Sequence, residues 1–121
     1  MTTHLTELAA EHGIQVTWVP RWQLAQAFAA TKHAYVPVIR RPSDYLFGLH
    51  EIGHVLAPHS LEAWDEPGSY AAVLCEGAAW AWASQHAKPS LARHLRKADW
   101  DRVAYAYRTY LAEHARLPPA A

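Results

Sequence analysis

The chain has 121 residues, of which 51% are hydrophobic, and its 11 basic side chains balance its 11 acidic ones. This length suits one compact domain, and the large apolar share excludes a disordered or low-complexity protein. The balanced charge gives no reason to expect direct nucleic-acid binding or adhesion to a membrane surface. No stretch approaches the roughly 20 apolar residues that a membrane-spanning helix needs.

The single cysteine, Cys75, and the first residues of the chain bear on the cellular compartment. One cysteine excludes an internal disulfide and is compatible with a reducing cytoplasm. Residues 1–7 lack the basic start and the apolar run of a signal peptide. We therefore expect a cytoplasmic protein with one domain, residues 1–121, in which residues 117–121 form a disordered tail.

The first third of the chain predicts one helix and two strands. Residues 3–11 have helical apolar spacing, and residues 14–19 show the alternation and the β-branched side chains of a strand. Residues 22–31 fit a helix by propensity, yet they can also form the first arm of a hairpin. Residues 34–39 predict a second strand, and Pro37, which cannot donate to a ladder, places that strand at an edge of the sheet.

The remaining residues predict three helices. The first runs from Ser43, a typical N-cap residue, to about residue 56. The second covers residues 69–87, and the third covers residues 99–116. The predicted architecture is therefore α+β, with a small antiparallel strand layer packed on a helical core.

The first of these helices contains the sequence His50-Glu51-Ile52-Gly53-His54. Residues four apart lie on one face of a helix, so His50 and His54 can direct two imidazole nitrogens at one tetrahedral Zn²⁺. Glu51 is one step around the helix from His50. Its carboxylate can therefore reach a zinc-bound water without binding the metal, which suits a general base. Gly53 leaves room for a close neighbouring helix.

Glu76 is the leading candidate for the third zinc ligand. It lies 22 positions after His54 in an apolar helical stretch, where a lone carboxylate needs a partner such as a cation. The small residues at 77–79 would let this helix approach the motif helix closely.

Two other residues, His59 and Asp65, are alternatives to Glu76 as the third ligand, and Cys75 is its neighbour in the sequence. His59 falls five residues after His54, whereas metzincin sites place the third histidine six residues after the second, with a glycine between. Asp65 is possible, but it lies in a loop whose orientation the sequence does not define. Cys75 points about 100° away from Glu76 around the helix, so we expect a buried, inert thiol.

The strand-rich start, the helix with His-Glu-Ile-Gly-His and the later helix with Glu76 together resemble the ImmA/IrrE peptidase family. The similarity covers roughly residues 14–87 and is strongest at 46–56 and 74–83. The resemblance implies a zincin-like fold of the gluzincin type. It implies His50, His54 and Glu76 as zinc ligands, Glu51 as the catalytic base, and a repressor protein as the substrate.

The leading functional hypothesis is a zinc-dependent endopeptidase that cuts a cytoplasmic protein, such as a DNA-binding repressor, by attack of a zinc-bound water that Glu51 activates. The alternatives are a metal-containing regulatory binding protein that acts by contact, as an anti-repressor would, and a zinc hydrolase of a non-peptide bond. Residues 42–87 contain six acidic residues and no Lys or Arg, which favours a basic substrate segment. The strand near residues 35–39 could also pair with an extended substrate.

A donor that stabilises the oxyanion cannot be selected from the sequence. The candidates share a hydroxyl or imidazole group on a predicted helix: Tyr70, Tyr105, Tyr107, Tyr110 and His114.

Overall fold

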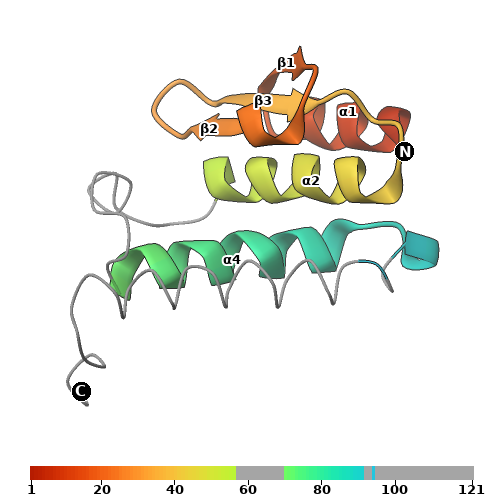
Figure 1. Ribbon diagram of the computed structural model, residues 1–121. Coiled ribbons are helices and arrows are strands. Elements are labelled where there is room, and N and C mark those ends of the chain that lie inside the picture. Colours follow the sequence, from red (N-terminus) through yellow and green to blue (C-terminus); the bar gives the residue numbers. More distant parts are fainter. Residues whose placement is uncertain (57–69, 92–93, 95–121) are drawn as a thin grey trace.

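The computed structural model describes residues 1–56, 70–91 and 94, and the described part forms three α-helices and one three-stranded sheet (Figure 1). In chain order these are helix α1 and strands β1, β2 and β3, followed by helices α2 and α4. Their bounds are Thr2–Glu11 for α1, Gln15–Val19 for β1, Gln26–Phe28 for β2, His33–Pro37 for β3, Pro42–Leu56 for α2 and Tyr70–His86 for α4. Short 3-10 helices cover Trp22–Leu24 (η1) and Pro89–Leu91 (η2). The α+β prediction is therefore confirmed.

Two predicted segments lie outside the described residues, namely the helix at 99–116 and the tail at 117–121. Among the described helices, none has the length and apolar content required to cross a membrane.

The sheet has the order β1-β3-β2, with β3 in the centre. β3 pairs with β1 in parallel and with β2 in antiparallel orientation. The expectation of an antiparallel layer is correct for the pair β2–β3 and wrong for the pair β1–β3, because the chain turns back twice between β1 and β3. The ambiguous residues 22–31 supply the reason: they form η1 and then β2, the first arm of a hairpin with β3. β3 therefore runs in the same direction as β1.

Pro37 ends the central strand, so the expectation that its strand lies at an edge is also wrong. The backbone N–H of Val38 donates to the Val19 carbonyl at 2.8 Å, toward β1. Backbone groups of successive strand residues point to opposite sides, so the Pro37 nitrogen points toward the side of β2. The β2 pairing reaches only Tyr35, opposite Gln26. The missing N–H of Pro37 therefore costs no ladder hydrogen bond.

α2 lies between the sheet and α4 and has apolar neighbours on both sides (Figure 1). Ten of its 15 residues are buried, which is more than the single stripe of an ordinary amphipathic helix. Leu49 and Ile52 are fully buried in the same core as Val36 of β3 and Trp80 of α4. A helix buried on two sides places even its polar side chains inside the molecule.

The start of α2 is capped by Asp44 and not by the predicted Ser43. The helix begins at Pro42, and one carboxylate oxygen of Asp44 accepts the backbone N–H groups of Arg40 and Arg41, both at 3.0 Å. Asp44 is 6% exposed. An acidic side chain in the first turn also interacts favourably with the helix dipole, which explains why this carboxylate is tolerated there.

α2 and α4 approach each other closely at Gly53. A Cβ atom at this position would lie 2.6 Å from the Ala79 carbonyl oxygen and 3.1 Å from its Cα. The prediction that Gly53 admits a close helix neighbour is confirmed. Of the small residues at 77–79, Ala79 forms the contact, whereas Gly77 has open space around its Cα and Ala78 is exposed.

Gly53→Ala and Gly77→Ala form a matched pair that tests this contact. We expect Gly53→Ala to lower the free energy of unfolding by about 1–3 kcal/mol, because the new methyl group would meet backbone atoms that cannot move aside. Gly77→Ala should raise it by about 0.5–1 kcal/mol, because alanine favours a helix interior and meets no neighbour. Urea unfolding of both variants checks the difference. Equal effects would contradict the close approach of the two helices.

Candidate metal centre

α2 places His50, Glu51 and His54 on adjacent parts of its surface, as the helical spacing predicts. His50 is 4% exposed and His54 is 2% exposed, so both imidazoles are buried. Glu51 is half-buried. Two buried imidazoles on one helix require polar partners, because an unpaired polar group in the interior is costly.

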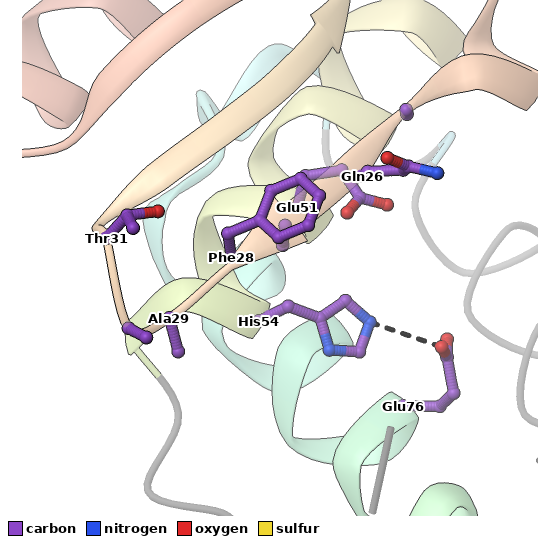
Figure 2. A pocket seen from close by; sticks show the side chains of 10 residues that line it. Gln26, Phe28, Ala29, Thr31, Glu51, His54 and Glu76 are labelled. Atoms are coloured by element: carbon purple, nitrogen blue, oxygen red, sulfur yellow. Dashed lines mark hydrogen bonds and ion pairs between the residues drawn. The ribbon is translucent and has the colours of Figure 1, made fainter. Parts of the chain in front are cut away.

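α4 supplies one such partner, the carboxylate of Glu76. Its Oε1 atom lies 3.2 Å from Nε2 of His54, and its Oε2 atom lies 3.2 Å from Nε2 of His50. The two Nε2 atoms are themselves 2.9 Å apart. Figure 2 shows the side chains of His54 and Glu76 directed toward each other from the two helices.

The three side chains are close enough to hold a metal ion, and the ligand atoms they offer all lie within 4.8 Å of one another. Ligands about 2.0–2.1 Å from a tetrahedral zinc are roughly 3.3 Å apart. The separations of 2.9 and 3.2 Å between the nitrogen and oxygen atoms are close to that value. Two imidazoles and a carboxylate are also a donor set that zinc accepts at catalytic sites. The residues present therefore fit the ion that the sequence predicts.

The environment of Glu76 favours its charged form. Burial alone would raise the pKa of this carboxyl, but the hydrogen bonds and the charges from His50 and His54 outweigh burial. Together they hold the pKa of Glu76 well below its usual range. An ionised carboxylate beside two buried imidazoles is the form that a cation would bind.

An aromatic row fixes the orientation of His50. The His50 ring stacks on the fully buried Trp80 of α4, with centroids 4.1 Å apart and planes 28° apart. Trp80 meets Phe47 edge-on at 5.8 Å, and Phe47 stacks on Trp22 at 5.0 Å. Packing of this kind restricts the ring of a ligand before any ion is bound.

Glu51 lies beside the three close side chains without belonging to their group. It lines a cavity of about 650 Å³ together with His54, Glu76 and residues 25–31, which include β2. Gln26 lines the same cavity, and Figure 2 shows the Glu51 carboxylate apart from the contact between His54 and Glu76. Glu51 also lines a second cavity, of about 270 Å³, with His50, Glu76 and Trp22 among its neighbours. Its carboxylate thus faces space that a substrate can enter.

Other residues considered from the sequence fall outside this centre. Cys75 is buried at 7% exposure, as predicted, and it is not in the group of close ligand side chains. Burial, followed by the charge of Glu76, raises the pKa of its thiol, which keeps it protonated. His59, Asp65 and the candidate donors at 105–114 lie outside the described residues, as does the side chain of Tyr70.

Two features of the site were not predicted from the sequence. Residues 25–31 line the larger cavity, and the only signal for them was the possible hairpin arm at 22–31. The stacking of Trp80 on His50 was also missed. Trp80 lies four residues after Glu76, so helical spacing already placed it on the same face.

Comparisons with family models, with curated proteins and with solved structures found no significant match to this chain.

Proposed function

We propose that the protein is a zinc-dependent endopeptidase of the gluzincin type. The observation that carries this proposal is the convergence of His50, His54 and Glu76 on one point, within 3.2 Å of one another. Glu51 lies outside that group but lines both cavities that border it. A structural metal site has no need of a carboxylate next to its ligands, whereas a hydrolase needs a base there.

His50, His54 and Glu76 would hold the ion. Bound zinc supplies a Lewis acid that polarises a carbonyl group and lowers the pKa of a water molecule to about 7. The chain's own contribution is to keep the three side chains in place, through the contact of Gly53 with Ala79 and the stacking of Trp80 on His50.

Glu51 would act as the general base. Its carboxylate accepts a proton from the attacking water while the water oxygen bonds to the peptide carbonyl carbon. It then returns that proton to the leaving nitrogen as the C–N bond breaks, so that the carboxylate is regenerated. A position beside the ligand atoms but not among them suits this role.

The cavity next to Glu51 supports a peptide as the substrate. β2 is an edge strand, and its middle residue, Ala27, lines the cavity. The Lys32 carbonyl accepts the Gln15 N–H and the Val38 N–H donates to the Val19 carbonyl, so backbone groups of the even-numbered residues at β3 point toward β1. Ala27 lies opposite one of these, Ala34, so its own N–H and C=O point away from the sheet. An extended peptide can form hydrogen bonds with such an edge. The expectation that residues 35–39 offer this edge is wrong, because β3 lies in the centre.

Membership of the ImmA/IrrE family, a repressor as the substrate and a cytoplasmic location remain part of this proposal. Their support is the sequence resemblance over residues 14–87 and the single cysteine. The alternative is regulatory binding without proteolysis, and the Glu51→Gln variant distinguishes it from catalysis.

Metal analysis of the purified protein tests the ligand assignment. We expect about one zinc ion per wild-type chain and per Glu51→Gln chain, because Glu51 is outside the ligand group. His54→Ala and Glu76→Gln should retain much less zinc, because each removes one of the three donors. Elemental analysis after dialysis against a weak chelator measures the content.

Zinc addition to the metal-free protein gives a second readout for the same variants. A ligand that binds only the folded state at 100 times its Kd stabilises that state by about 2.7 kcal/mol. The wild type and Glu51→Gln should show this rise in thermal stability, and Glu76→Gln should not. Full zinc content and a full thermal shift in Glu76→Gln would remove Glu76 from the site.

Glu51→Gln also tests catalysis. The amide cannot accept the proton, so we expect the peptidase rate to fall by about 10²–10⁴-fold with zinc content and thermal stability unchanged. Peptide cleavage followed by mass spectrometry measures the rate. Full activity of zinc-loaded Glu51→Gln would exclude Glu51 as the base, and cellular function that survives in this variant would favour a binding role.

A further inference from the structure

Three cavities follow one another along the segment that contains η1 and β2. The cavity of about 650 Å³ shares Ala25, Glu51 and Glu76 with the cavity of about 270 Å³. The latter shares Trp22 and Gln23 with a third cavity, of about 380 Å³, at the start of α2. We call this row of cavities the groove. The candidate metal centre lies between its two ends, and those ends differ in chemistry.

The end beside β2 is lined mainly by small apolar side chains. Its lining includes Ala27, Phe28, Ala29 and Ala30, and apart from Glu51, His54 and Glu76 it contains no ionisable side chain. Figure 2 shows Phe28 and the short side chain of Ala29 among the residues that line this cavity. Such a surface suits a small apolar side chain of a bound peptide.

The end at the start of α2 is basic. It contains the exposed side chains of Arg21, Arg40 and Arg41, and one acidic side chain, Asp44. The Asp44 carboxylate is buried and accepts the backbone N–H groups of Arg40 and Arg41. Within the described part of the chain, none of these three guanidinium groups forms an ion pair. Each of these guanidinium groups can therefore form a bidentate hydrogen-bonded ion pair with a carboxylate of a ligand.

The separation of the basic end from the metal centre can be expressed in peptide residues. Asp44 precedes His50 by six residues of α2, which corresponds to about 9 Å along the helix axis. An extended peptide advances about 3.3 Å per residue. The basic end is therefore roughly three peptide residues away from the centre.

We propose that the groove binds an extended peptide with an acidic side chain among Arg21, Arg40 and Arg41, about three residues from the bond that is cut, and a small apolar side chain beside β2. This inference rests on the proposed peptidase function, and it names the class of peptide that the site accepts. The proposal differs from the expectation, drawn from the acidic residues at 42–87, that the substrate segment is basic. Three of the six acidic residues behind that expectation lie outside the described residues, at positions 62–66.

The test uses the zinc-loaded full chain and a mixture of ten-residue peptides of randomised sequence, with the products identified by mass spectrometry. We expect Asp or Glu to be enriched three- to tenfold at about the third position from the cut, on one side only, as one or two partly exposed ion pairs would provide. Small apolar residues should be enriched on the other side.

The double variant Arg40→Gln with Arg41→Gln should lose most of the acidic enrichment among the peptides that it cuts, because Arg21 alone of the three arginines remains. Lys88→Gln is the matched control, because it also removes an exposed positive charge but lines none of the three cavities. It should keep the wild-type preference. A charge-reversing pair, Arg40→Glu with Arg41→Glu, should favour Lys or Arg at the same position.

Binding of labelled peptides to zinc-loaded Glu51→Gln tests the peptide preference of the groove separately from the peptidase activity. A peptide with Glu at the third position should bind three- to tenfold more tightly than its Gln counterpart, and salt should weaken that difference. Cleavage by the wild type with equal binding and no acidic enrichment would overturn the inference and leave the peptidase function standing. Tighter binding of the Glu peptide, with no cleavage of any peptide by the zinc-loaded wild type, would overturn the peptidase function and leave the groove as a peptide-binding surface.

Discussion

The candidate site depends on the close contact between α2 and α4 at Gly53 and Ala79. A Cβ at position 53 would lie 2.6 Å from the Ala79 carbonyl oxygen, so the two backbones touch there. Gly53 directly precedes His54, and Ala79 lies three residues after Glu76. The contact therefore sets the distance between the imidazoles of one helix and the carboxylate of the other. A larger residue at 53 would separate the ligand groups as well as the helices.

The same contact creates an electrostatic requirement. Two imidazoles with 4% and 2% exposure meet a half-buried carboxylate, and buried polar groups are stable only with partners. The lowered pKa of Glu76 shows that the histidines already favour its charge. A divalent cation would satisfy all three groups at once, which is the physical reason to interpret the cluster as a metal centre.

The sheet contributes the entrance to this centre. Because β3 pairs with β1 on one side and with β2 on the other, the short β2 becomes the edge that borders Glu51. The turn through η1 also brings Trp22 onto Phe47, next to the aromatic row that orients His50. The inner residues of the sheet support α2, while its edge and the η1 turn border the cavities.

Local sequence patterns determined the three α-helices of the described part of the chain and the pairing of its main site residues. The i, i+4 spacing of His50 and His54 and the lone carboxylate of Glu76 in an apolar helix were sufficient, because helical periodicity is a short-range property. The parallel pairing of β1 with β3, the edge position of β2 and the groove depended on the tertiary structure. Strand order and cavities arise from contacts between distant segments, which no local periodicity encodes.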